Sequence, residues 1–84
     1  VFLQQLKLDS FANATISEVV YNPKQGMIAM TNAHGVKLTF GHEAFAKKFE
    51  NWKVFNRQVV KNRGLQAFQE VDLRFPNQII TREV

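Results

Sequence analysis

The sequence contains no cysteine, and this absence excludes two kinds of small domain. Neither a disulfide framework nor a zinc site built on thiolates can form without cysteine. Glycine is also sparse, and the four glycines are scattered over expected turns and helix ends. A glycine-rich phosphate-binding loop, which needs several glycines at short fixed spacing, is therefore not present.

Long apolar runs are absent as well. No stretch approaches the roughly 20 apolar residues that a membrane-spanning helix needs, and no signal-peptide pattern is visible. The chain starts with Val1 on an apolar segment, so we expect it to be a piece of a longer protein. Its 84 residues, 45% of them hydrophobic and eight of them Phe, predict one small domain with its own core over residues 1–84.

Charge is unevenly distributed along the chain. The formal net charge is +4, and six of the 11 basic residues lie between residues 43 and 63, together with only two acidic ones. These basic residues are Lys47, Lys48, Lys53, Arg57, Lys61 and Arg63. Such a pattern is typical of the solvated face of a helix, and it leaves open a nucleic-acid or acidic-surface binding function for the basic helix 43–63.

The first half of the chain predicts a short helix followed by three strands. Residues 1–8 have apolar residues at helical spacing, whereas the small and polar residues 9–15 predict a connection. Residues 16–22, 27–32 and 36–40 are rich in β-branched and apolar residues, and short turns with Pro23, Gly26 and Gly35 separate them. Strands joined by short turns predict an antiparallel meander.

A long helix is expected from about His42 to Asn62. Five large apolar residues recur there at helical spacing and form one stripe. They are Phe45, Phe49, Trp52, Phe55 and Val59. Lys48 lies beside the stripe, so we expect its aliphatic stem to pack along apolar surface.

Residues 69–84 predict a terminal hairpin. Val71, Leu73 and Phe75 alternate with charged residues, residues 76–77 form a turn, and residues 78–84 return as a second strand. The predicted fold class is therefore α+β: an antiparallel sheet of about five strands, made of the meander and the hairpin, with the long helix packed on one face. Glu70 and Asp72 share the polar face of the first strand with Arg74, and a surface ion pair between these acidic residues and Arg74 is expected.

The last predicted strand has few of the features that protect sheet edges. Residues 78–81 contain no proline and no lysine, and no further strand of the chain follows to cover them. We therefore expect this edge to accept an extended segment of a partner. Catalysis is not expected, because the two histidines, His34 and His42, lie in a turn and at a helix start. No catalytic residue, cofactor or metal ligand is assigned.

Three segments resemble the extracytoplasmic part of the bacterial cell-division family FtsQ/DivIB. They are Ile16-Ser17-Glu18-Val19, Lys37-Leu38-Thr39-Phe40-Gly41, and Val71-Asp72-Leu73-Arg74-Phe75-Pro76-Asn77. The resemblance implies the second, β domain of that part, with a membrane helix and a POTRA domain upstream of Val1. It also implies a location on the periplasmic side of the inner membrane, at the septum.

The resemblance further implies a non-enzymatic scaffold. Members of the family bind FtsB and FtsL, and a strand of FtsB adds to their last strand. Carried onto this chain, the partner-binding residues are Phe75, Asn77, Ile79, Ile80, Thr81 and Arg82. Lys24, in the first turn of the meander, corresponds to a basic position that faces an acidic residue of FtsB.

Overall fold

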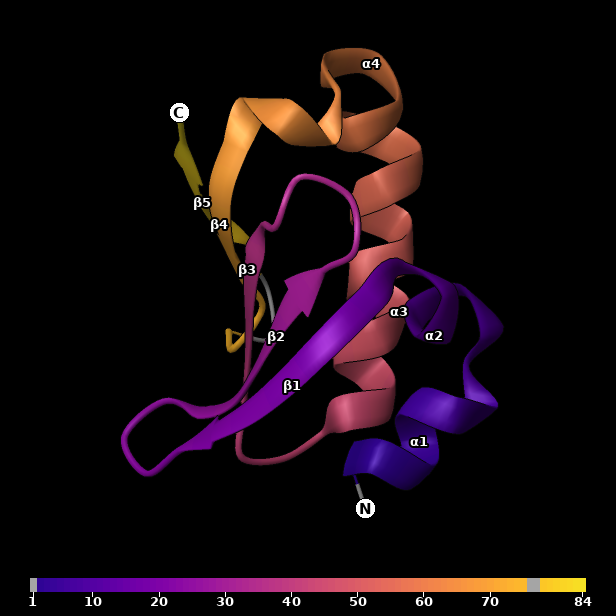
Figure 1. Cartoon of the computed structure of the whole chain (residues 1–84), viewed down its shortest axis with the longest axis vertical. Coiled ribbons are helices and arrows are strands. Elements are labelled where there is room, and N and C mark those ends of the chain that lie inside the picture. The colour runs from indigo at the N-terminus through magenta and orange to yellow at the C-terminus, as the bar shows by residue number, and fades with distance from the viewer. Residues whose placement is uncertain (1, 76–77) are drawn as a thin grey trace.

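The computed structural model of the chain describes residues 2–75 and 78–84 (Figure 1). Two short helices are followed by three strands, a long helical run and two further strands. The helices are α1 (Phe2–Leu8), α2 (Ser10–Thr15), α3 (Phe45–Phe55), the π-helical turn η1 (Asn56–Val60), α4 (Lys61–Arg63) and the 3₁₀ turn η2 (Leu65–Ala67). The strands are β1 (Ile16–Asn22), β2 (Gly26–Thr31), β3 (Lys37–Gly41), β4 (Phe68–Asp72) and β5 (Ile80–Glu83).

The five strands form one sheet in the order β1-β2-β3-β4-β5. In Figure 1 the helices all lie on the same side of this sheet, with α3 running along it. These observations confirm the predicted α+β class, the five strands and the packing of the long helix on one face. Among the described residues, no helix is long and apolar enough to span a membrane.

One strand pairing differs from the wholly antiparallel sheet expected from the sequence. β4 pairs with β3 in parallel, with Leu38 opposite Val71, whereas the other three pairings are antiparallel. The reason is the helical run between them, which carries the chain back along the sheet so that β4 starts at the same end as β3. The sheet is therefore mixed.

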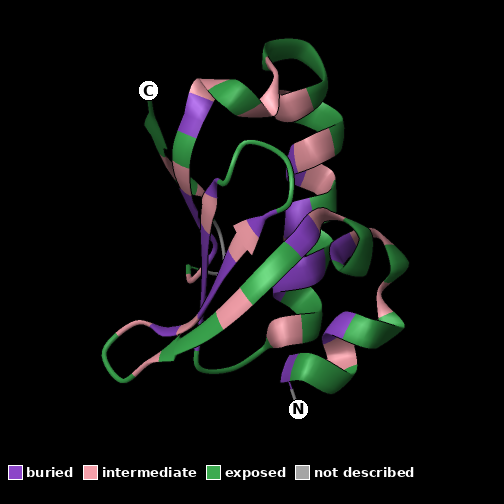
Figure 2. Cartoon of the chain, in the orientation of Figure 1, coloured by how far each residue is buried: buried purple, intermediate pink, exposed green. Residues whose placement is uncertain are grey.

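The core lies between the sheet and α3, where Figure 2 shows the buried residues facing one another. Trp52 and Phe49 of the predicted stripe are almost completely buried, and Phe55 is 6% exposed. They meet the inward side chains of β3, including Leu38 and Phe40, which are fully buried. The stripe is thus buried, as its helical spacing predicts, and it packs α3 against the middle of the sheet.

The N-terminal segment contributes more to the fold than the sequence suggested. Phe2 of α1 is buried, and its ring lies 5.3 Å from that of Phe40 and 5.1 Å from that of Phe49. Residues 10–15 form the helix α2 rather than a connection, because Asp9 caps it by accepting a hydrogen bond from the main-chain N–H of Ala12 at 2.9 Å. An aspartate at this position satisfies an N–H that the helix itself leaves without an acceptor.

Candidate partner-binding edge

β5 forms one border of the sheet, and it pairs with β4 on one side only. Among the described residues, no strand lies on its other side. In an antiparallel strand the main-chain groups point alternately to the two sides, so about half of those in β5 have no partner strand. β5 therefore has the main-chain geometry that strand addition requires.

The register with β4 decides which way each side chain of β5 faces. Thr81 lies opposite Val71, a buried core residue, so its side chain is on the helix-covered face of the sheet. Ile80 and Arg82 are on the other face, on which the structure places no helix (Figure 1). Ile80 is 47% exposed, which is large for an isoleucine in a strand, and it gives the edge an apolar contact point.

Two ion pairs hold β5 in place. Arg82 lies 3.3 Å from the carboxylate of Glu70 on the neighbouring strand, and Glu83 pairs with Arg63 at the end of the helical run. The main-chain N–H of Val84 also donates to the carbonyl of Ala67 at 2.9 Å. In each ion pair at least one side chain is well exposed. The two pairs therefore orient β5 more than they stabilise the fold.

The remaining candidate residues lie in different surroundings. Ile79 is half-buried against the core, whereas Phe75 is 39% exposed, with the guanidinium of Arg74 5.5 Å from its ring centre. Asn77 lies outside the described residues. Phe75 and Ile79 lie on either side of residues 76–77, the predicted turn, which is outside the described residues.

Lys24 lies in the exposed turn between β1 and β2, at the lower left of Figure 1. The side chain of Asn22 shapes this turn by accepting the main-chain N–H groups of Lys24 and Gln25 at 2.8 and 3.0 Å. β1 is the border of the sheet opposite β5, although this turn and the β4–β5 connection lie at the same end of the strands. The fold thus separates Lys24 from the β5 edge by the width of the sheet.

The ion pair at the end of β4 is partly buried rather than superficial, contrary to the expectation from the sequence, because its carboxylate is buried whereas the side chain of Arg74 is 35% exposed. Asp72 is only 7% exposed, and its carboxylate accepts hydrogen bonds from both the side chain and the main-chain N–H of Arg74. Burial alone would raise the pKa of Asp72. The hydrogen bonds from Arg74 and the positive charges of Arg74 and Lys37 outweigh this effect, and the pKa lies below its ordinary value.

This pair predicts a specific dependence of stability on pH. Because the folded-state pKa of Asp72 is lower than the unfolded one, the stabilisation is complete above the ordinary value of about 3.9 and is lost as the pH falls through the folded-state pKa. Asp72→Asn should lower the free energy of unfolding near pH 7 by about 1–3 kcal/mol and have a much smaller effect at the lowest pH. Urea denaturation of both proteins across this pH range measures the difference.

Glu70→Gln is the matched control, because Glu70 is on the same strand but forms an exposed pair with Arg82. Its effect should stay within about 1 kcal/mol. If the free energies of unfolding of Asp72→Asn and the unchanged protein differed by the same amount at every pH, the ion pair of Asp72 would not be the source of the predicted pH dependence.

A family model described as "FtsQ/DivIB, C-terminal related" matches residues 1–82, almost the whole chain. The chain belongs to this FtsQ/DivIB family. Membership confirms the resemblance seen in the three sequence segments, and the matched region includes β5 up to Arg82.

A cell division protein FtsQ from Rhodothermus marinus supports the same assignment. It is 35% identical to this chain over an alignment of 80 residues, and the alignment covers 90% of the chain. The chain spans 29% of that FtsQ protein's length. Membership of the FtsQ/DivIB family supports a role in cell division.

Proposed function

We propose that this chain is part of a non-enzymatic scaffold of the cell-division complex, and that it recruits FtsB/FtsL-like proteins by strand addition to β5. The observation that carries the proposal is the open outer side of β5 in the described sheet. Family membership makes a division partner the natural occupant of this edge. The same resemblance supports a location on the periplasmic side of the inner membrane, with the full-length protein anchored by one upstream helix.

Strand addition would use the main chain for affinity and the side chains for selectivity. An incoming extended segment forms hydrogen bonds with the unpaired N–H and C=O groups, as a sixth strand would. Its alternate side chains then meet Ile80 and Arg82 on one face and Thr81 on the other. Exposed Ile80 offers an apolar contact, and the guanidinium of Arg82 favours a partner with a carboxylate beside its strand.

Lys24 would act on the same partner from a distance. Because its turn lies at the end of the sheet where β5 begins, a partner that continues past β5 could cross this end and place an acidic residue near Lys24. An exposed charge of this kind raises the association rate and fixes orientation more than it adds affinity.

Ile80→Pro tests the strand-addition mechanism. Proline removes a main-chain N–H and restricts the strand, so the affinity for an FtsB-like partner should fall by roughly tenfold or more. Ile80→Val keeps the N–H and a β-branched side chain, and its affinity should stay within about threefold of the unchanged protein. Isothermal titration calorimetry with the purified partner gives both affinities, and circular dichroism shows whether the fold persists.

If Ile80→Pro disturbs the fold, Ile80→Lys provides the second test, because an edge lysine hinders pairing of strands without restricting the backbone. Unchanged binding by a folded Ile80→Pro or Ile80→Lys protein would contradict the mechanism. Backbone NMR shifts on partner addition should change over residues 69–84.

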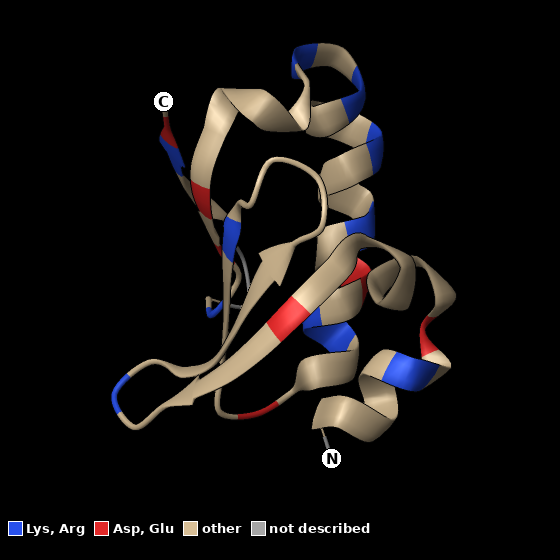
Figure 3. Cartoon of the chain, in the orientation of Figure 1, with Lys and Arg blue, Asp and Glu red and all other residues tan. Residues whose placement is uncertain are grey.

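The basic helix face supports the alternative, an acidic or nucleic-acid partner. Figure 3 shows Lys and Arg spread along the helical run from α3 to α4, and all of them except Lys48 are exposed. Shift changes confined to residues 47–61 and strong weakening of binding by salt would favour this alternative over strand addition.

A further inference from the structure

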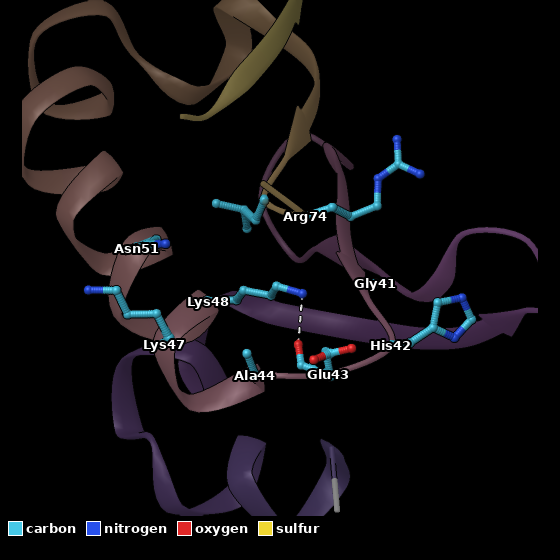
Figure 4. A pocket seen from close by; sticks show the side chains of 9 residues that line it. Gly41, His42, Glu43, Ala44, Lys47, Lys48, Asn51 and Arg74 are labelled. Carbon is cyan, nitrogen blue, oxygen red and sulfur yellow. Dashed lines mark hydrogen bonds between the residues drawn. The ribbon is translucent and has the colours of Figure 1, made fainter. Parts of the chain in front are cut away.

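A pocket of roughly 370 Å³ lies at the start of α3, away from the outer side of β5 (Figure 4). Its walls come from three parts of the chain: the end of β3 with the loop that follows, the first turns of α3, and the residues just after β4. Leu73, Ala44 and the aliphatic stems of Lys47 and Lys48 make much of the lining apolar. The site is therefore shaped for a group that is largely apolar.

Lys48 brings a positive charge into this apolar pocket. The residue is only 8% exposed, and its ammonium donates to the main-chain carbonyl of Glu43 at 2.7 Å (Figure 4). Among the described residues, no carboxylate oxygen lies within 4.0 Å of this ammonium. An ammonium has three protons to donate, so Lys48 can donate to a further acceptor in the pocket, and a negatively charged acceptor gives the stronger hydrogen bond.

Glu43 and Asp72 act on Lys48 only at longer range, because neither carboxylate forms an ion pair with it. Arg74 lines the same pocket, and its guanidinium is held by Asp72 at 2.6 Å. Burial, opposed by the negative charges of Glu43 and Asp72 and reinforced by Arg74, holds the pKa of Lys48 below its ordinary value. A carboxylate that entered the pocket would therefore stabilise the charged form of Lys48 and raise this pKa.

The first turn of α3 adds to the positive potential of the pocket. Ala44, the residue before the helix, adopts a left-handed conformation with φ 57° and ψ 42°, and it offers no side-chain acceptor to the helix. The first N–H groups of an α-helix have no acceptor within the helix. Ala44 and Lys47 both line the pocket, so this uncapped turn borders it.

Lys48 is buried, forms no ion pair with the described residues and faces apolar walls, and from this we propose that the pocket binds a carboxylate on a short aliphatic stem, the glutamate side chain of a protein partner. The carboxylate accepts hydrogen bonds from the ammonium of Lys48 and from the uncapped turn of α3, while the stem lies against Leu73. The proposal does not depend on strand addition to β5, because the two sites use different residues.

The experiment is an NMR titration of the folded chain with N-acetyl-glutamate N-methylamide. Its neutral counterpart, N-acetyl-glutamine N-methylamide, has the same stem without the charge. The glutamate compound should give saturable shift changes at the main-chain amides of residues 45–48 and at the ammonium of Lys48, and it should raise the pKa of Lys48. The glutamine compound should bind at least roughly tenfold more weakly, because charge-assisted hydrogen bonds are about twice as strong as neutral ones.

Two lysine variants separate the role of Lys48 from that of general positive charge. Lys48→Met keeps an unbranched apolar stem and removes the donor, so saturable binding of the glutamate compound should be lost. Lys53→Met removes an exposed positive charge on the same helix but outside the pocket, and binding should stay within about threefold. If Lys48→Met does not fold, the glutamate-induced rise in the pKa of Lys48 in the unchanged protein decides the question.

Equal binding of the glutamine compound, or no saturable shifts at residues 45–48, would overturn the proposal. Inorganic phosphate provides a further comparison: tighter binding of phosphate than of the glutamate compound would show a general anion site and would also overturn it. Failure of strand addition at β5 would leave this result unaffected, since Ile80→Pro does not alter the lining of the pocket.

Discussion

Trp52→Ala should lower the free energy of unfolding by about 3–5 kcal/mol, the range for removing a large aromatic residue from a core. The side chain of Trp52 is completely buried, and its ring stacks on that of Phe55 with the ring centres 6.1 Å apart. Its indole N–H donates to the hydroxyl of Thr15 at 3.0 Å, which ties α3 to the end of α2. A domain of this size has a net stability of about 5–15 kcal/mol, so the change removes a large part of it.

Urea denaturation followed by circular dichroism measures the loss. Trp52→Phe keeps an aromatic ring and removes the hydrogen bond to Thr15, so it should cost less than Trp52→Ala. Lys53→Ala is the surface control on the same helix, and its effect should stay within about 0.5 kcal/mol. Equal stability of Trp52→Ala and Lys53→Ala would show that the core does not depend on this residue.

Gly26→Ala should be nearly as damaging, with an expected loss of about 2–5 kcal/mol. Gly26 starts β2, lies opposite Gly41 of β3 and has a φ of +84°. A Cβ atom added there would lie 2.2 Å from the main-chain carbonyl carbon and oxygen of Gly41. The clash is with backbone, which cannot rotate away, and it adds to the strain of a left-handed alanine.

Gly35→Ala is the matched control for Gly26→Ala. Gly35 also has a positive φ, +57°, but the nearest atom to an added Cβ is the methyl carbon of Met30 at 4.0 Å. This variant has the conformational strain without the clash, and it should lose only about 1–2 kcal/mol. Thermal or urea denaturation that ranks the two variants equally would contradict the role of the close approach between Gly26 and Gly41.

The sequence predicts the α+β class, the five strands and the α3 stripe because each depends on local spacing. Residues such as Phe49 and Trp52 recur with the period of a helix, and this period alone identifies the buried face. The parallel pairing of Leu38 with Val71 cannot be predicted in this way. It depends on where the chain lies after the helical run, which is a property of tertiary packing and not of either strand.

The residue before the helix α2 predicts where this helix begins. Asp9 stands three residues before Ala12, and an acidic residue in this position is a strong cap for a helix that follows. The burial of Asp72 was not predictable, because strict alternation in β4 places it on the wetted face. It is buried on a face without a helix, where the side chain and main chain of Arg74 donate hydrogen bonds to it.

The two candidate sites also differ in how far the sequence predicts them. The position of β5 at the border agrees with the element order, because β5 is the last of the described strands and pairs only with β4 among them. The pocket around Lys48 joins residues from β3, α3 and the end of β4, which are far apart in the sequence. The sequence places the stem of Lys48 beside the apolar stripe. It does not indicate that the ammonium forms no ion pair with the described residues.

The parallel pairing of β3 with β4 has a consequence for when the border of the sheet at β5 forms during folding. β5 touches the rest of the sheet only through β4, and β4 reaches β3 only after the whole helical run has folded back. Contacts between segments so distant along the chain form late, because closing a long loop costs entropy before the contacts compensate for it. We therefore expect the border at β5 to form late in folding, together with the pairing of β3 with β4.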